Sequence, residues 1–276
     1  MKVEQQPAYV LHARPFSESS SLIDVFTREH GRLMLLAKGA RRGKSKWRGV
    51  LLPFKLLLAS WAGKGQLPSL TAAEHILSTS APPASADGCS QRASMRGGAL
   101  ASGFYLNELL LKLLHRHDAH ERLFEQYDLA LRRLAQDESP RHALRVFEKN
   151  LLQQIGFGAA LERDAETGEA IAADERYRYV PEKGPVRAAR ASDGDRVANT
   201  ETETADARAQ SFLVIRGSTL QALRDEAFPS DLELREAQRL TRMLIDRQLS
   251  GRALRSRRVM VEMKQRLDQA RQSPSE

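Results

Sequence analysis

The sequence predicts an α+β fold in which an N-terminal five-stranded β-barrel precedes a mainly α-helical region that also contains a short stretch of strand candidates. Short apolar runs broken by turn residues fill residues 1–79, and apolar residues recur at helical spacing from residue 103 onward. Residues 80–102 are rich in Ser, Ala, Pro and Gly, a composition typical of a flexible linker. These observations divide the chain into a barrel, a linker and a helical region.

The barrel region contains strand candidates with turn residues between some of them. In chain order they are AYVLHARP, SLIDVFTREHG, GRLMLLAKGA, VLLPFKLLLASWAG and QLPSLTAAE. The stretches EHG (29–31) and GKG (63–65) suit tight turns. Short strands of this kind fit a small closed barrel, for which the OB fold is the expected form and an SH3-like barrel is the alternative.

Helices are predicted after the linker. Apolar residues of one helical face recur at Leu106, Leu109, Leu110 and Leu113. Another helix begins at Ser139-Pro140, which supply an N-cap and a first-turn proline, and ends at Gly156. Further helices are expected at about 121–134, 231–249 and 255–270. Helices are therefore expected within residues 103–159 and 217–276.

The segment of residues 160–216 has a weaker apolar pattern than the helices before it. Its strand candidates are ERYRYVPEKG (175–184) and SFLVIRG (211–217). Residues 186–210 between them are polar and nearly free of large apolar side chains, so this loop is expected to be disordered.

Composition limits the classes of partner. The 276 residues carry a formal net charge of +8 with a pI near 9.8, which favours nucleic acid or acidic protein surfaces as partners. The single cysteine, Cys89, excludes an intrachain disulfide and a cysteine-rich zinc site. The sequence has neither the run of about 18 apolar residues that spans a membrane nor the apolar core of a signal peptide. A cytoplasmic protein that does not contact membrane is expected.

The stretch AKGARRGKSKWRG (37–49) contains Gly43-Lys44-Ser45, the second half of a nucleotide-binding P-loop. The P-loop motif needs a glycine where this chain has Lys38, and the sequence that follows reads as strand instead of helix. We therefore expect no nucleotide cofactor.

A polyanion-binding surface explains the same stretch better, because clustered cations contact phosphates and an aromatic ring offers a face for base stacking. The candidate nucleic-acid-binding residues are Arg14, Arg32, Lys38, Arg41, Arg42, Lys44, Lys46, Trp47 and Arg48. Trp47 either stacks on bases or packs into the barrel core, and the sequence leaves both open.

Other candidate sites are weak. His115 and His117 would point to nearly opposite sides of a helix, so with His120 they make no specific metal site, and none is expected. The serines at 17 and 19–21 lack a nucleophile motif, so no catalytic residue is expected and the chain is not predicted to be an enzyme. Arg141, Arg145 and Lys149 lie on one helical face and suit an acidic peptide, although an ordinary solvated basic surface explains the spacing equally well.

Several dispersed segments resemble one known family. They are AYVLHARPFSESSSLIDVFTREHGRL, LAKGARR, LLPF, FYLNELLLKLL, ALRVFEKNLLQQIGFG, YRYVPEKG and LRSRRV. In this order they resemble RecO, a family of bacterial recombination mediators, from about residue 8 to residue 263.

The resemblance implies an N-terminal OB barrel, a helical domain of residues 103–159 and 217–276, and a zinc-finger-like domain inserted at residues 160–216 that is cysteine-free here. It implies binding of single- and double-stranded DNA, annealing of complementary strands, and a nucleoid-associated location. It also implies cooperation with RecR, and in many bacteria RecF, so that RecA replaces single-strand-binding protein. The acidic tail of that protein is expected to dock on the helical domain, with Arg145 gripping it and Phe147 and Leu151 shaping the pocket floor. An RNA-binding OB module and a purely protein-binding scaffold are the alternatives.

Overall fold

The structure is a computed structural model that describes residues 2–63, 65–76, 95, 97–136, 140–188 and 212–272. The chain forms two compact units, Met1–Phe147 with Arg252–Glu276, and Glu148–Gly251. The border between them falls within helix α4 (Pro140–Gln154). Each unit is described in turn.

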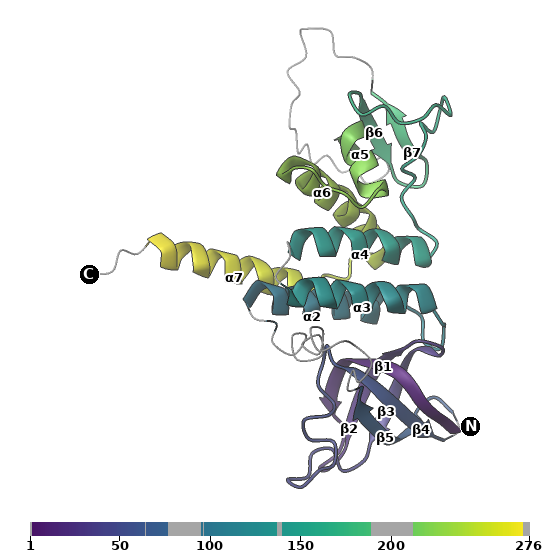
Figure 1. The fold of residues 1–276 in the computed structure, drawn as a ribbon, viewed down its shortest axis with the longest axis vertical. Coiled ribbons are helices and arrows are strands. Elements are labelled where there is room, and N and C mark those ends of the chain that lie inside the picture. Colours follow the sequence, from purple (N-terminus) through teal and green to yellow (C-terminus); the bar gives the residue numbers. More distant parts are fainter. Residues whose placement is uncertain are drawn as a thin grey trace, which may run out of the picture. The chain divides into compact units, whose positions relative to one another are not determined.

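The first unit begins with a closed β-barrel (Figure 1). Its strands are β1 (Lys2–Pro15), β2 (Ser21–Thr27), β3 (Gly31–Ala37), β4 (Leu56–Ala62) and β5 (Ser69–His75). They follow one another around the barrel in the order β1-β2-β3-β5-β4. The barrel closes through a parallel pairing of β3 with β5 at Leu36 and Ser69, whereas the other neighbours are antiparallel. The predicted five-stranded N-terminal sheet is confirmed.

Strand β1 is long because its first half, from Lys2 to Tyr9, pairs with β4 and its second half, from Ala8 to Pro15, pairs with β2. The pairing register shifts between Val10 and His12 on one side and between Val3 and Gln6 on the other. Such irregularities bend a strand and increase its twist, which lets a single strand complete a small barrel.

Every second side chain along β3 and β4 is buried, and these inward side chains fill the barrel with apolar groups. In β3, Leu33 and Leu35 are buried, whereas the alternate residues Met34 and Leu36 are half-buried. Strand β2 differs, because its outward side chains are buried as well. Phe26 of β2 contacts Phe124 of the neighbouring helix α3 (Glu121–Ala135), with ring centroids 5.5 Å apart. A helix therefore covers this side of the barrel.

The turn between β2 and β3 is the predicted one at residues 29–31. Gly31 has a φ of +62°, and a Cβ at this position would lie 1.8 Å from the carbonyl oxygen of Asp118. Only glycine fits both the left-handed backbone and this close approach.

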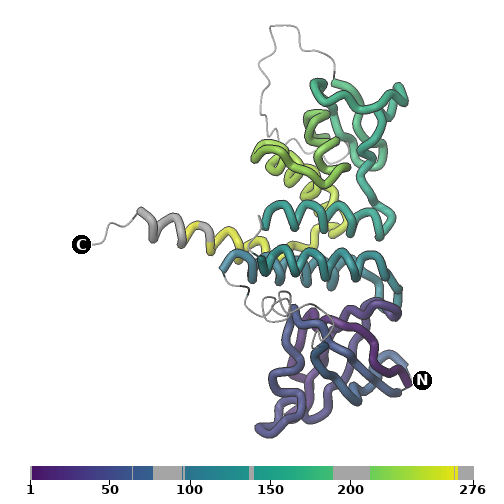
Figure 2. Tube along the Cα trace, in the orientation of Figure 1, coloured from purple at the N-terminus to yellow at the C-terminus, as the bar shows by residue number. Residues whose placement is uncertain are grey.

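The helices of the first unit are α2 (Gly97–Leu113), α3, α7 (Arg255–Gln272) and the first part of α4. Figure 2 follows the chain from the purple and blue barrel into the teal helices. Helix α2 is joined to the barrel by Asn107, whose amide donates to the carbonyl oxygen of Leu11 at 2.9 Å. Helix α2 begins at Gly97, inside the segment predicted as linker, because Ala99, Ser102 and nearby residues bury side chains. Residues 80–94 and 96 of that segment lie outside the described residues.

The second unit contains a three-stranded antiparallel sheet in the order β7-β6-β8. Its elements are β6 (Arg176–Val180), β7 (Gly184–Arg187), β8 (Leu213–Arg216), α5 (Gly217–Arg224) and α6 (Asp231–Leu249). Strand β7 continues to Arg187, so the predicted disordered loop does not begin at residue 186; residues 189–211 lie outside the described residues.

Helices α5 and α6 group with this sheet. Glu236 of α6 accepts hydrogen bonds from the Thr219 hydroxyl at 2.6 Å and from the backbone N–H of Arg216 at 3.2 Å. Gln221 of α5 donates to the carbonyl oxygen of Ile171 at 2.7 Å. The predicted domain borders at residues 160 and 216 do not coincide with the borders of this unit and stay predictions.

Candidate nucleic-acid interface

The basic loop, residues 38–55 between β3 and β4, is a chain of tight turns. The backbone N–H of Arg42 bonds to the Gly39 carbonyl, that of Ser45 to Arg42, and that of Arg48 to Ser45, at 3.0–3.2 Å. After Ser45 the chain continues in turns and enters β4, without the helix that a P-loop requires. This backbone leaves the charged side chains between Lys38 and Arg48 exposed, whereas Trp47 is buried.

Most of the predicted nucleic-acid-binding residues are exposed. The exposed cations are Arg14, Lys38, Arg41, Arg42, Lys44, Lys46 and Arg48. All except Arg14 lie on the basic loop, and Arg14 lies near the end of β1. A cluster of exposed cations on one loop can contact several phosphates of a polyanion.

Two of the loop's cations also fasten it to the barrel. The Arg41 guanidinium donates to the carbonyl oxygen of Ser17 at 2.6 Å, and the Arg41 backbone N–H donates to that of Ser19 at 3.0 Å. The Lys46 ammonium donates to the carbonyl oxygen of Thr71 at 2.9 Å. Arg41 therefore has a structural role in joining the β1–β2 turn to the basic loop, in addition to its charge.

Trp47 packs into the barrel core and is 5% exposed. Its indole N–H donates to the carbonyl oxygen of Lys38 at 2.9 Å, and the Lys46 ammonium lies 4.4 Å from the ring centroid. Of the two roles that the sequence left open, the structure places this ring in the core. Stacking on a base would require it to leave that position.

Arg32 also lies away from the exposed cations. Its side chain is 13% exposed, lies 3.8 Å from the Asp24 carboxylate, and donates to the carbonyl oxygens of Leu111 and Leu114. Burial lowers the pKa of Arg32, and the Asp24 carboxylate partly offsets this effect. Arg32 joins the barrel to the end of α2, which its position on a predicted strand did not reveal.

A pocket of about 360 Å³ lies where the β1–β2 turn meets the basic loop. Its lining residues are Phe16, Ser17, Ser19, Ser20, Leu36, Lys38, Gly39 and Arg42. Phe16 is 56% exposed and was missed as a site residue. The available signal was an aromatic residue in a serine-rich turn, next in sequence to the end of a strand.

The predicted tail-binding residues lie on α4 and are less accessible than the loop. Arg145, Phe147 and Leu151 are buried, and Arg141 is half-buried. The Lys149 ammonium lies 2.6 Å from the Glu226 carboxylate and donates to the carbonyl oxygen of Arg224 at 3.3 Å. Spacing alone suggested a basic face, whereas these side chains are largely enclosed.

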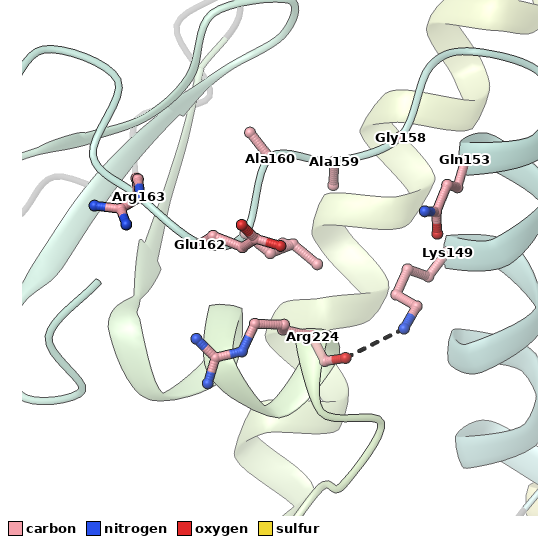
Figure 3. Close-up of a pocket in the computed structure, with 9 residues that line it drawn as sticks. Lys149, Gln153, Gly158, Ala159, Ala160, Glu162, Arg163 and Arg224 are labelled. Atoms are coloured by element: carbon pink, nitrogen blue, oxygen red, sulfur yellow. Dashed lines mark hydrogen bonds between the residues drawn. The ribbon is translucent and has the colours of Figure 1, made fainter. Parts of the chain in front are cut away.

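Lys149 also lines a pocket of about 580 Å³ within the second unit (Figure 3). The other lining residues are Gln153, Gly158, Ala159, Ala160, Leu161, Glu162, Arg163 and Arg224. In Figure 3, Lys149 and Gln153 project from the helix toward the segment that carries Glu162 and toward Arg224. The pocket combines small apolar side chains with three cations and one carboxylate.

Across the described residues, no group of three or more His, Cys, Asp or Glu side chains is placed to hold a metal ion. His120 pairs with Asp118 at 3.2 Å, and Cys89 lies outside the described residues. In the same part of the chain, no helix is both long and apolar enough to cross a membrane.

Comparisons with known proteins identify the family. Residues 1–79 match the family model described as Recombination protein O N terminal, and residues 96–258 match Recombination protein O C terminal. The DNA repair protein RecO of Azoarcus sp. (strain BH72) is 39% identical over 262 residues, which cover 95% of this chain and 97% of that protein. The protein of the same name from Dechloromonas aromatica (strain RCB) is 41% identical over 267 residues, covering 96% and 98%. The one from Methylococcus capsulatus (strain ATCC 33009 / NCIMB 11132 / Bath) is 43% identical over 250 residues, covering 91% and 90%. The chain therefore belongs to the RecO family of DNA repair proteins.

Proposed function

We propose that this chain is a DNA-binding recombination mediator that anneals complementary single strands. In this proposal it acts at the nucleoid with RecR, and with RecF where present, to help load RecA onto DNA coated by single-strand-binding protein. The observation that carries the proposal is the row of exposed cations on the basic loop. Membership of the RecO family supports it.

Annealing by such a surface needs no catalytic residue. Cations bound to phosphates reduce the repulsion between two backbones and release condensed counterions. Binding should then weaken steeply with salt, with a log–log slope of about −0.7 for each contacted phosphate of a single strand and about −0.9 for duplex.

We assign the barrel to the OB fold, a five-stranded partly open barrel that binds oligonucleotides on its surface. The strand order β1-β2-β3-β5-β4 and the parallel β3–β5 closure support this assignment. We also retain residues 160–216 as a cysteine-free inserted domain. The hydroxyls of Tyr179 and Tyr177 accept hydrogen bonds from the backbone N–H groups of Ala160 and Ala172. These contacts support an inserted domain that needs no metal.

The test removes charge from the loop without removing the Arg41 contacts. A variant with Ala at Lys38, Arg42, Lys44 and Arg48 should bind single-stranded DNA with a salt slope shallower by about 3. The matched control carries Ala at four exposed arginines of α6, namely Arg235, Arg239, Arg242 and Arg247. The measurement is fluorescence anisotropy of an oligonucleotide over a range of salt concentrations, followed by annealing rates.

Equal slopes in both variants would show that net charge, not the loop, governs binding. Unchanged DNA affinity in the loop variant would favour the protein-binding scaffold. The proposed contacts to phosphate and base do not discriminate by the ribose hydroxyl, so RNA must be tested by competition. A matched RNA oligomer that outcompeted the DNA would indicate an RNA-binding module.

We further propose that the acidic, hydrophobic-ended tail of single-strand-binding protein docks beside α4, with Arg141, Arg145, Phe147, Lys149 and Leu151 involved. The cations and small apolar side chains of the pocket beside Lys149 support this proposal. Lys149→Ala should weaken binding of a labelled tail peptide about tenfold, since a charge-assisted contact contributes about 1.5 kcal/mol. Arg239→Ala on α6 is the exposed control. A peptide that binds equally well without its hydrophobic end would contradict this docking.

A further inference from the structure

Phe16 is the exposed aromatic residue of the barrel. Within the described residues 2–63 and 65–76, the other aromatic side chains, Tyr9, Phe26, Trp47, Phe54 and Trp61, are all buried. Phe16 is 56% exposed and lies at the start of the β1–β2 turn, beside the basic loop. A flat apolar ring at this place is available to a ligand without any change in the barrel core.

The pocket beside Phe16 has the chemistry to hold one nucleotide. Leu36 supplies an apolar wall, Lys38 and Arg42 supply charge for a phosphate, and serine hydroxyls supply hydrogen-bonding groups. Its volume of about 360 Å³ lies at the low end of small-ligand pockets, which start at about 300 Å³. This size suits a single base with its phosphate.

The turn that carries Phe16 is held in place by hydrogen bonds. The backbone N–H of Phe16 donates to the carbonyl oxygen of Ser20 at 3.1 Å, and the Ser20 N–H donates to the Ser17 hydroxyl at 3.2 Å. The two Arg41 bonds described above join the same turn to the basic loop. The aromatic ring and the cations are thus kept together before any ligand arrives, which lowers the ordering cost of binding.

We propose that this pocket binds one nucleotide of single-stranded DNA, with the base stacked on Phe16 and its phosphate between Lys38 and Arg42. This inference rests on the proposed DNA-binding function. Bases in a duplex are already stacked on one another, so Phe16 favours single strands, whereas the loop cations serve both forms. The site also gives the stacking role to Phe16 instead of the buried Trp47.

The experiment compares the full chain with Phe16→Ala, Phe16→Leu and Phe16→Trp. Three probes of equal length are used, a labelled oligo-dT, an abasic strand and a duplex. The Ala and Leu variants should bind oligo-dT about 5- to 100-fold more weakly than the unchanged chain, because they lack a flat ring. All variants should bind the abasic strand and the duplex like the unchanged chain, with the same salt slope. Phe157→Ala, at a Phe that is 50% exposed in the second unit, should change nothing.

Phe16→Trp provides a direct readout. It should retain affinity for oligo-dT, and its fluorescence should be quenched when oligo-dT binds, since the native Trp47 and Trp61 are buried. The inference is overturned if Phe16→Ala binds oligo-dT like the unchanged chain, or if it loses duplex binding to the same extent. Failure of the unchanged chain to bind any DNA would instead overturn the proposed function, and this inference with it.

Discussion

The barrel and the β7-β6-β8 sheet are both small β-structures, but they are stabilised by different interactions. The barrel surrounds a continuous apolar cluster that includes Leu33, Leu35, Leu57 and Trp61. The three-stranded sheet has fewer large apolar side chains, and polar atoms of buried residues bind the backbone of the segments around it. The barrel is therefore stabilised by apolar burial, which does not involve its surface side chains. The sheet region depends on specific polar contacts instead.

Three residues provide these polar contacts in the sheet region. The Tyr179 hydroxyl accepts from the backbone N–H of Ala160, and the Tyr177 hydroxyl from that of Ala172, both at 3.0 Å. The Asp164 carboxylate accepts from three backbone N–H groups, as detailed below. Burial raises the pKa of Tyr179 to about 12, further above neutral pH than the ordinary tyrosine value of about 10. Such contacts organise irregular backbone, which a bound metal ion does in other small domains.

The difference explains why the barrel tolerates so many cations on one loop. Apolar burial inside the barrel does not depend on the identity of exposed loop side chains such as Lys44. The loop sequence is therefore free to serve binding, apart from Trp47 and the anchoring contacts of Arg41 and Lys46.

The largest effect is expected in the barrel core. Leu35 is fully buried, so Leu35→Ala should lower the free energy of unfolding by about 3–5 kcal/mol through lost burial and a residual cavity. Lys44→Ala on the basic loop should change it by less than about 0.5 kcal/mol. Urea unfolding followed by circular dichroism measures both. A cost at Lys44 approaching that at Leu35 would show that the loop is structural and would remove the contrast.

The strands could be predicted from the sequence because their residues obey local rules. The apolar run in GRLMLLA marks β3, and Gly31 marks the turn before it, whereas only the structure shows which of these apolar side chains face the core. The exposed cations of the basic loop were predicted for the same reason, since a short turn-rich segment leaves charged side chains in solvent. These features depend on neighbours in sequence.

Other features depend on contacts between distant segments, and no local rule contains them. The sequence leaves open whether Trp47 stacks on a base or packs in the core. Its burial and the hydrogen bond from its indole N–H to the Lys38 carbonyl oxygen place it in the core. Arg141 and Arg145 are four residues apart and lie on one helical face, yet Arg145 is buried and Arg141 is only half-buried. Helical spacing does not show which part of that face other segments cover. Strand β7 was missed because its four residues, Gly184–Arg187, are too short for a pattern.

Asp164→Asn tests whether polar contacts stabilise the sheet region. It should lower the free energy of unfolding by less than Leu35→Ala does. Asp164 is 2% exposed, and its carboxylate accepts from the N–H groups of Glu166 at 2.8 Å, Thr167 at 2.9 Å and Arg187 at 2.6 Å. Burial alone would raise the pKa of Asp164, but these hydrogen bonds outweigh burial and lower it below its ordinary value. Asp164→Asn should therefore cost about 2–3 kcal/mol at pH 7, the size of a lost charge-assisted hydrogen bond.

The sign of the pH dependence follows from that lowered pKa. A carboxyl with a lower pKa in the folded protein stabilises it above the unfolded value of about 3.9, and this contribution disappears as the pH falls through the folded pKa. Unfolding by urea at a series of pH values from about 7 down to 3 should show a steep acid loss in the unchanged chain. The loss should be shallower in Asp164→Asn, whereas Glu166→Gln, which changes an exposed carboxylate paired with Lys183, should retain it. Parallel acid profiles for the unchanged chain and Asp164→Asn would mean that the sheet region, like the barrel, is stabilised by apolar burial, because a buried carboxylate that anchors three backbone donors must lose its advantage on protonation.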